Sequence, residues 1–148
     1  MTDPDAVARD AAEAMWAGDE ASRGLGMTLD GVGPGHAVLS MTVAETMLNG
    51  HGMCHGGFIF ALADSAMAFA SNSHGAAAVA QHCAITFLRP ARCGERLTAE
   101  AVERIRHGRT GLYDARVTGT EGDVVAEFRG QARLLRREPE AAPSPPAT

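Results

Sequence analysis

The sequence predicts an α+β domain in which a curled antiparallel sheet of five to six strands wraps around one long buried helix. Two observations support this prediction. Residues 57–72 are apolar on nearly every side of a helix and contain a single carboxylate, so this helix has to be covered from most directions. Strand-like runs separated by turn residues lie on both sides of it, two before and four after. A sheet of that size can bury the helix only by curving around it.

The N-terminal part predicts a short helix followed by a hairpin. Pro4 fits the first turn of a helix behind Thr2 or Asp3 as cap, and apolar residues recur at four-residue spacing until Gly18. Two β-like runs follow, separated by a Gly-Pro-Gly turn. The expected ranges are residues 4–17 for the helix and residues 26–32 and 36–43 for the two strands.

The second half of the chain predicts a series of strands. The last of them alternates apolar and polar residues with a period of two, which places one face on the core and the other in water. The segment after Arg137 is rich in proline and has nothing to bury. We therefore expect one domain at residues 1–137 and a disordered tail at residues 138–148. The expected strands cover residues 79–88, 96–106, 111–118 and 124–135.

The composition excludes several classes of protein. The chain has 148 residues, 45% of them hydrophobic, which suits a single domain. No run approaches the roughly 20 apolar residues that span a bilayer, so we expect a soluble, cytoplasmic protein without a membrane partner. Three cysteines without paired spacing favour reduced thiols over disulfides. A net charge of −5 argues against nucleic-acid binding. No nucleotide-binding glycine motif is present, and we expect no cofactor.

Residues 49–64 form the segment in which chemistry is expected, because a polar, glycine-rich turn leads there into the apolar helix. A glycine turn at a helix start presents unpaired backbone N–H groups and the positive end of the helix dipole, which stabilise a developing negative charge. Gly56 and Gly57 occupy this position. Asp64 follows two turns later among apolar neighbours. It is either a surface acid or a carboxylate facing a cleft, and the nearby glycine turn favours the cleft.

The spacing between Gly56 and Asp64 has a further consequence. Eight residues of helix span about 12 Å, whereas an oxyanion donor and an attacking carboxylate must both lie within about 3.5 Å of one reacting group. The two groups of one chain therefore cannot act on the same carbonyl. If both are catalytic, a two-fold dimer must bring the turn of one subunit to the acid of the other.

Other polar residues of the turn have two possible roles. Asn49 can orient a substrate carbonyl or a water, or it can simply favour the turn. His51 and His55 are four residues apart, but the surrounding glycines disfavour the helix that a metal pair would need, so no metal is expected. We expect His55 to hold the turn and His51 to line the cleft. Cys54 lacks a recognisable His and acid pair and is interpreted as a packing residue.

The assembled pattern resembles the hotdog-fold thioesterases of the phenylacetic-acid degradation type. The resemblance rests on Asn49, on His55-Gly56-Gly57, and on Asp64 within Ala-Leu-Ala-Asp-Ser-Ala. It extends over about residues 5–135. Similar runs are Thr-Phe-Leu-Arg-Pro at residues 86–90, Gly-Glu-Arg-Leu-Thr-Ala at 94–99, Gly-Arg-Thr-Gly-Leu-Tyr-Asp at 108–114 and Ala-Glu-Phe-Arg-Gly at 126–130.

The resemblance implies hydrolysis of acyl-CoA thioesters, especially aryl-acetyl ones such as phenylacetyl-CoA or its hydroxylated forms. On matching positions, the N–H of Gly56, together with Gly57, polarises the thioester carbonyl. Asp64 of the neighbouring subunit either attacks this carbonyl or activates water, and Asn49 positions the substrate or the water. The resemblance also implies dimers that pair further into a homotetramer.

An acyl-CoA substrate offers a role for the arginines, which number 2 in residues 1–64 and 11 in residues 65–148. Most are explained as solvated surface charge, but Arg89, Arg106 and Arg109 occupy loop positions and are candidates for CoA phosphates, as is Arg92. Two alternatives remain at this point. A non-catalytic acyl-CoA-binding or regulatory protein of the same fold would not need Asp64, and a hydratase would yield a hydroxyacyl product instead of free thiol.

Overall fold

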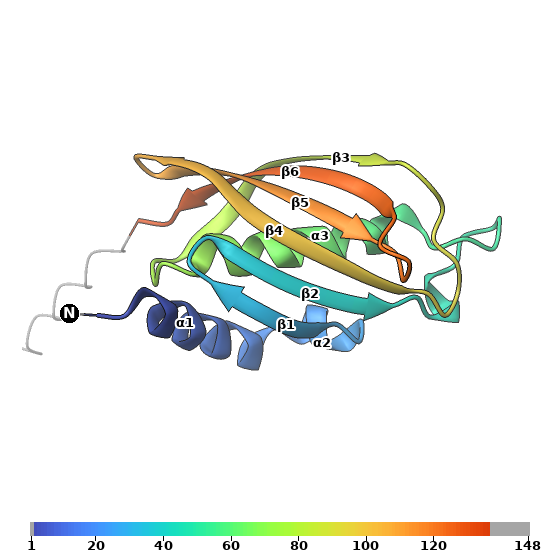
Figure 1. The fold of residues 1–148 in the computed structure, drawn as a ribbon, viewed down its shortest axis with the longest axis horizontal. Coiled ribbons are helices and arrows are strands. Elements are labelled where there is room, and N and C mark those ends of the chain that lie inside the picture. The colour runs from blue at the N-terminus through green and yellow to red at the C-terminus, as the bar shows by residue number, and fades with distance from the viewer. Residues whose placement is uncertain (1, 137–148) are drawn as a thin grey trace, which may run out of the picture.

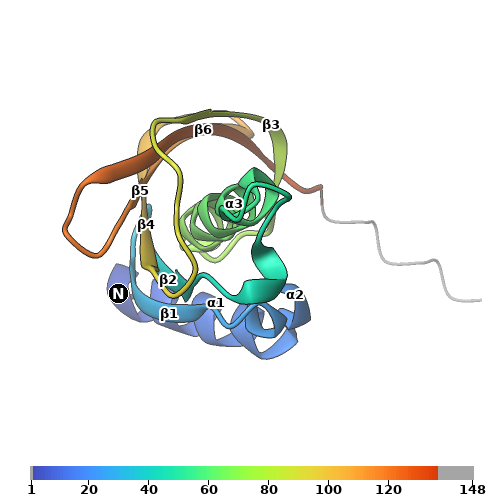
Figure 2. The ribbon, with the colours of Figure 1, turned by 90° about the vertical axis from the view of Figure 1, so that its right-hand side faces the viewer.

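A single six-stranded antiparallel sheet, curled around one long helix, dominates the computed structural model, which describes residues 2–136 (Figures 1 and 2). The order of strands across the sheet is β1-β2-β4-β5-β6-β3. The predicted fold class is therefore confirmed, with strand bounds within two residues of those expected. The strands are β1 (Thr28–Gly33), β2 (His36–Thr42), β3 (Ala78–Phe87), β4 (Arg96–His107), β5 (Thr110–Thr118) and β6 (Val124–Leu134).

The N-terminal helix α1 (Pro4–Gly18) forms as the sequence predicts. Asp3 is its N-cap, and the Asp3 side chain accepts a hydrogen bond from the backbone N–H of Asp5 at 3.1 Å. Trp16 of α1 packs against Phe69 of the central helix, with ring centroids 6.0 Å apart. This contact fixes α1 against the core.

Two short elements are additions to the predicted list: α2 (Glu20–Gly24) and a 3-10 helix, η1 (Glu45–Met47). Asp19 caps α2 by accepting hydrogen bonds from the N–H and the hydroxyl of Ser22 at 2.9 and 2.7 Å. The buried Ser22 hydroxyl lies 2.8 Å from the hydroxyl of Ser65. This chain of polar groups ties α2 to the central helix.

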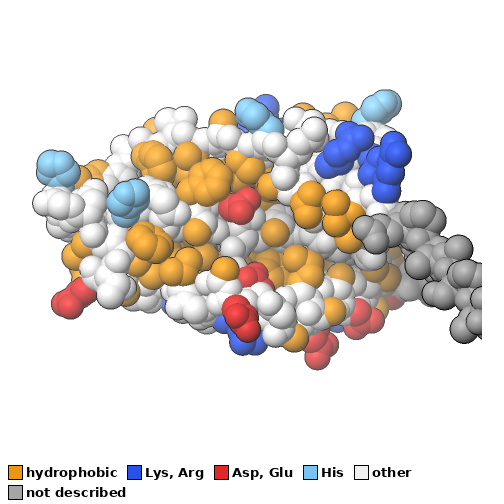
Figure 3. Space-filling model, turned by 180° about the vertical axis from the view of Figure 1, so that it is seen from behind, with side chains coloured by type: hydrophobic (Ala, Val, Ile, Leu, Met, Phe, Trp, Pro, Cys, Tyr) orange, Lys and Arg blue, Asp and Glu red, His pale blue; other side chains and the backbone are white. Residues whose placement is uncertain are grey.

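The central helix α3 (Gly56–Asn72) buries one side in the sheet. Leu62, Ala63 and Ala66 are each 0% exposed. The opposite stripe, which includes Ala61, Asp64 and Ala68, is only partly buried. The sheet covers most of α3, as expected, and leaves this one stripe of the helix partly exposed. Figure 3 looks onto the molecule from behind, where apolar side chains gather around an acidic one.

Strand β3 forms one edge of the sheet. It pairs with β6 on one side, and among residues 2–136 no strand pairs with its other side. Its side chains are largely exposed, with Val79 at 48% and Phe87 at 49%. A long exposed edge strand is a template for pairing with another chain. The open stripe of α3 and this unpaired edge thus remain available to a partner.

The expected tail, residues 138–148, lies outside the described residues. In the described part of the chain, no helix has the length and apolar character needed to cross a bilayer.

Candidate functional site

The turn before α3 is held by the side chain of Asn49. Its Oδ1 accepts hydrogen bonds from the backbone N–H groups of His51 and Met53, at 2.9 and 3.2 Å. The backbone N–H of Asn49 also donates to the carbonyl of Met53 at 2.7 Å. Asn49 therefore closes the turn through its oxygen. Its Nδ2 donates no hydrogen bond within residues 2–136 and stays available to a ligand.

His55 is the N-cap of α3 and leaves one backbone donor open. Its backbone N–H donates to the carbonyl of Met47 at 2.7 Å, and its Nδ1 accepts from the N–H of Gly57 at 3.1 Å. The N–H of Gly56 has no acceptor among the described residues. The open donor at the positive end of this 17-residue helix is thus Gly56, while Gly57 is already bonded to the cap.

An apolar pocket of about 450 Å³ lies beside Gly56. The ring of Phe87, at the end of β3, covers the Gly56 α-carbon so closely that a methyl group there would come within 2.8 Å of Phe87 Cζ. The pocket can hold an uncharged group next to the open N–H. It is lined by Met53, Cys54, Gly56, Ile59, Phe87, Leu88, Arg89 and Pro90.

Asp64 lies on the open side of α3, half-buried and without a cationic partner among the described residues. Burial raises the pKa of its carboxyl, and a weak hydrogen bond from the Cys83 thiol, at 3.9 Å, opposes that rise. A carboxylate with reduced hydration and few hydrogen bonds can act as a base or a nucleophile.

Within one chain, Gly56 and Asp64 do not face a common ligand. Both lie in α3, eight residues apart, which corresponds to about 12 Å of helix. The chain therefore carries an open backbone N–H beside an apolar pocket and, separately, a carboxylate on the open stripe of α3.

The remaining histidine and cysteine of the turn are placed as follows. His51 is exposed at the tip of the turn. Cys54 is buried, its thiol donates to the carbonyl of His55 at 3.6 Å, and desolvation together with the nearby Glu95 raises its pKa. A thiol held in its protonated form is a poor nucleophile. Across residues 2–136, no three His, Cys, Asp or Glu side chains are grouped so as to hold a metal.

Four arginines are candidates for phosphates from the sequence, and they differ in their surroundings. The backbone N–H of Arg92 donates to Glu95 at 3.1 Å. Arg89 is held between Glu95 and Asp123. Arg106 contacts Glu103 at 3.3 Å. Arg109 meets no carboxylate among the described residues and donates to the carbonyl of Leu134 at 2.7 Å. Arg109 thus keeps a positive charge that no described acid offsets.

Sequence reasoning missed two residues of this site, Cys83 and Phe87. Both lie within a predicted strand, and a strand pattern alone does not say that Cys83 reaches Asp64 or that Phe87 covers Gly56. A β-bulge between Ala80 and His82 shifts the register just before Cys83. No signal in the sequence marks this bulge.

Comparisons with known proteins find relatives that match most of the chain. Residues 51–126 match the model of the thioesterase superfamily. The chain is 46% identical over 124 residues to the acyl-coenzyme A thioesterase PaaI of Escherichia coli K12, which covers 84% of this chain and 89% of the relative.

Solved structures give the same result. The E. coli PaaI protein from the phenylacetic acid degradation operon superposes with a TM-score of 0.89 at 42% identity, over 90% of this chain and 97% of that one. A Streptococcus mutans UA159 protein solved with bound acetyl CoA superposes with a TM-score of 0.71 at 26% identity, over 74% and 88%. The sequence matches and the curled sheet around α3 together show that the chain belongs to the thioesterase superfamily and has the hotdog fold.

Proposed function

We propose that the protein hydrolyses acyl-CoA thioesters whose acyl group is aryl-acetyl, such as phenylacetyl-CoA or its hydroxylated forms, and releases CoA and the free acid. The observation that carries this proposal is the open N–H of Gly56 beside an apolar pocket. The E. coli relative is an acyl-coenzyme A thioesterase, and its structure is that of a protein of the phenylacetic acid degradation operon.

The Gly56 N–H would donate to the thioester oxygen as negative charge develops there, with the α3 dipole adding to its effect. Asp64 of the partner subunit would act in one of two ways. As a nucleophile it forms an acyl anhydride and expels the CoA thiolate, and water then cleaves the anhydride. As a general base it takes a proton from the attacking water. In either case the C–S bond breaks, water supplies the new acid oxygen, and CoA leaves as the thiol.

The Nδ2 of Asn49 is suited to position the reacting water or the substrate carbonyl, because its Oδ1 is already used in the turn. His55 supports the same site indirectly by capping α3 and fixing the direction of the Gly56 N–H. The N–H of Gly57 is bonded to His55, so Gly57 supports the site by helping to fix the first turn of α3. The exposed His51 has room to contact substrate at the rim.

A two-fold dimer is part of this proposal. The unpaired edge of β3 and the partly exposed stripe of α3 lie on the same side of the molecule, as the contact between Cys83 and Asp64 requires. A two-fold axis beside β3 would pair two such edges antiparallel and bring two α3 helices face to face. Light scattering of the purified protein distinguishes this dimer from the expected tetramer.

The proposal is tested by replacing Asp64 with Asn, which keeps the shape and removes the charge. Release of free thiol from phenylacetyl-CoA should fall at least about hundredfold, the contribution expected of a base or nucleophile, while binding of the acyl-CoA persists. Hydrolysis at the parent rate would refute the catalytic role of Asp64. A wild-type protein that binds phenylacetyl-CoA without hydrolysing it would instead support the regulatory alternative.

Mixed dimers test the composite site. A chain with Gly56→Pro lacks the N–H donor, and a chain with Asp64→Asn lacks the carboxylate. If each site takes one group from each subunit, reassorted dimers of two inactive chains regain about one quarter of the wild-type sites, because half of them are mixed and each mixed dimer has one complete site. Recovery of no activity after reassortment would refute the shared site.

A further inference from the structure

One wall of the pocket beside Gly56 is formed by residues 87–91, which we call the pocket wall. Its side chains have little packing of their own, because Phe87 is 49% exposed and Leu88 is 57% exposed, although both line the pocket. Side chains that are half in water gain little from burial. The position of the pocket wall is therefore set by its backbone and by the groups that hold it.

Two backbone hydrogen bonds attach the pocket wall to its surroundings. The N–H of Leu88 donates to the carbonyl of Val125 in β6 at 2.8 Å. At the other end of the wall, the carbonyl of Ala91, a residue that is 0% exposed, accepts from the N–H of Cys54 at 2.9 Å. Cys54 comes two residues before Gly56. A shift of the wall is thus passed on to the turn that carries the open N–H.

Arg89 lies in the middle of the pocket wall and ties it to two loops. Its guanidinium pairs with Glu95, just before β4, and with Asp123, in the turn between β5 and β6. Its Nη1 donates to Glu95 at 3.2 Å and to the carbonyl of Pro90, within the wall, at 2.9 Å. These loops and the start of α3 lie at the same end of the molecule (Figure 1, right; Figure 2).

The guanidinium of Arg89 packs closely against Gly119. A Cβ at this glycine would overlap Nη2 of Arg89 and would lie 3.0 Å from Oδ1 of Asp123. Hydrogen bonds from Arg89 lower the pKa of Glu95 and of Asp123, so both acids stay ionised at neutral pH. A planar guanidinium that meets two carboxylates is held in one orientation.

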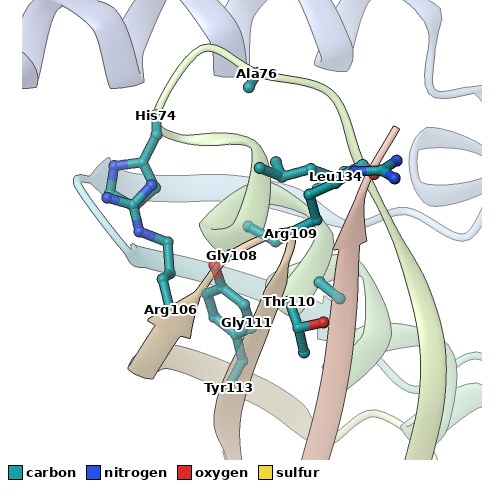
Figure 4. A pocket seen from close by; sticks show the side chains of 12 residues that line it. His74, Ala76, Arg106, Gly108, Arg109, Thr110, Gly111, Tyr113 and Leu134 are labelled. Atoms are coloured by element: carbon teal, nitrogen blue, oxygen red, sulfur yellow. The ribbon is translucent and has the colours of Figure 1, made fainter. Parts of the chain in front are cut away.

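The other arginines that the sequence nominates occupy different places. Arg106 and Arg109 line a separate pocket, beside His74 after the end of α3 (Figure 4). Arg92 is exposed. Of the four, Arg89 is the one that lines the pocket beside Gly56. Four hydrogen bonds to protein acceptors occupy its guanidinium, which leaves little of it for a phosphate.

We propose that Arg89 is a positioning residue that sets which acyl groups the protein accepts, by holding the pocket wall against the turn before Gly56. It acts through Phe87, Pro90 and the carbonyl of Ala91 and does not touch the reacting atoms. The inference rests on the proposed function, because it takes this pocket as the place of the acyl group. A displacement of about 1 Å can cost about 10² in rate, so a small movement of the wall is enough.

The test measures selectivity for the acyl group with one leaving group. The quantity is kcat/KM for phenylacetyl-CoA divided by kcat/KM for acetyl-CoA. In Arg89→Met this selectivity ratio should fall about tenfold or more, because a displaced apolar wall loses contact with a phenyl ring and hardly affects a methyl group. Arg116→Met is the matched control, since Arg116 pairs with Glu127 at 2.6 Å on β5, away from the pocket. Its ratio should stay at the wild-type value.

Two further variants disturb the guanidinium without replacing it. Asp123→Asn removes one of its two carboxylates, and Gly119→Ala introduces a methyl group where Nη2 now lies. Both should lower the selectivity ratio, Asp123→Asn by about twofold to fivefold because Glu95 remains paired. Asp123 has a side chain that is 48% exposed, so this variant decides the question if Arg89→Met does not fold.

Thioesters of pantetheine separate positioning from phosphate binding. With phenylacetyl-pantetheine and acetyl-pantetheine, the selectivity ratio of Arg89→Met should fall by the same factor as with CoA, since the wall contacts the acyl group. An equal loss of kcat/KM for both CoA thioesters that is absent with pantetheine would indicate a phosphate contact and would overturn the proposal. An equal loss for all four thioesters would indicate a general effect on the fold and would overturn it too.

The outcomes also separate this inference from the proposed function. If wild-type protein hydrolyses phenylacetyl-CoA and the selectivity ratio of Arg89→Met is unchanged, the inference fails and the proposed function stands. If wild-type protein does not hydrolyse phenylacetyl-CoA, the proposed function fails, and Kd values for the two CoA thioesters, measured by calorimetry, take the place of kcat/KM. A lower preference of Arg89→Met for binding phenylacetyl-CoA would then support the inference, and an unchanged preference would overturn it.

Discussion

Gly56 allows the proposed oxyanion donor to be removed with little other change. It is the first residue of α3, and His55 before it has φ −62° and ψ 134°, a conformation that a following proline permits. Proline is favoured at the first position of a helix. Gly56→Pro should therefore fold while lacking the backbone N–H.

Gly56→Ala provides the matched control. Both substitutions place a Cβ about where the ring of Phe87 now lies, 2.8 Å from its Cζ. Phe87 is 49% exposed, so its ring can move aside in either variant. Alanine keeps the N–H and proline removes it, so the difference between the variants isolates the hydrogen bond.

Loss of one oxyanion donor costs about 2.7–4 kcal/mol of transition-state stabilisation, or a factor of about 10²–10³ in kcat. We expect Gly56→Pro to turn over phenylacetyl-CoA slower than Gly56→Ala by this factor, as measured by release of free thiol. Thermal melts of both variants check that each is folded. Equal kcat values in two folded variants would show that the Gly56 N–H does not stabilise the transition state.

Three further predictions concern other residues. Cys83→Ala removes the hydrogen bond that lowers the pKa of Asp64, so the acidic limb of the pH–kcat profile should move to higher pH. Cys83→Ser is the control, because serine retains a donor. Identical profiles for wild type and both variants would contradict this. Asn49→Asp keeps an oxygen for the turn but loses the Nδ2 donor, so kcat should fall about tenfold or more with little change in melting temperature; unchanged turnover would limit Asn49 to the turn. Leu62→Ala, at a site that is 0% exposed, should lower the free energy of unfolding by about 2–5 kcal/mol, as measured by denaturant titration. Ile105 is 57% exposed, so Ile105→Ala should lower it by less than about 1 kcal/mol.

The main elements could be predicted because they rest on local patterns. The apolar run of α3, the period-two alternation of β6 and the Pro4 start of α1 each leave a signature within a few residues. In contrast, α2 is too short for a helical period to be visible, and its cap depends on Asp19 folding back onto Ser22.

The candidate site was less predictable, because its details depend on contacts between distant residues. The sequence indicates Gly56 and Asp64, but it does not reveal that His55 already occupies the N–H of Gly57. Nor does it reveal that Arg89 meets Asp123, 34 residues away. The hydropathy of α3 likewise indicates that the helix is covered, but it does not distinguish cover by the same chain from cover by a second copy.

The unpaired edge of β3 has a kinetic consequence. A single chain would hold an oxyanion donor and a carboxylate that cannot meet, so an isolated subunit would have no complete site at all. Specific activity should then fall on dilution, in proportion to the fraction of chains that remain associated. Substitutions along the outer side of β3 would reduce solubility and turnover together, because in the proposed dimer the same row of backbone groups would be shielded from aggregation and would bring the catalytic groups together.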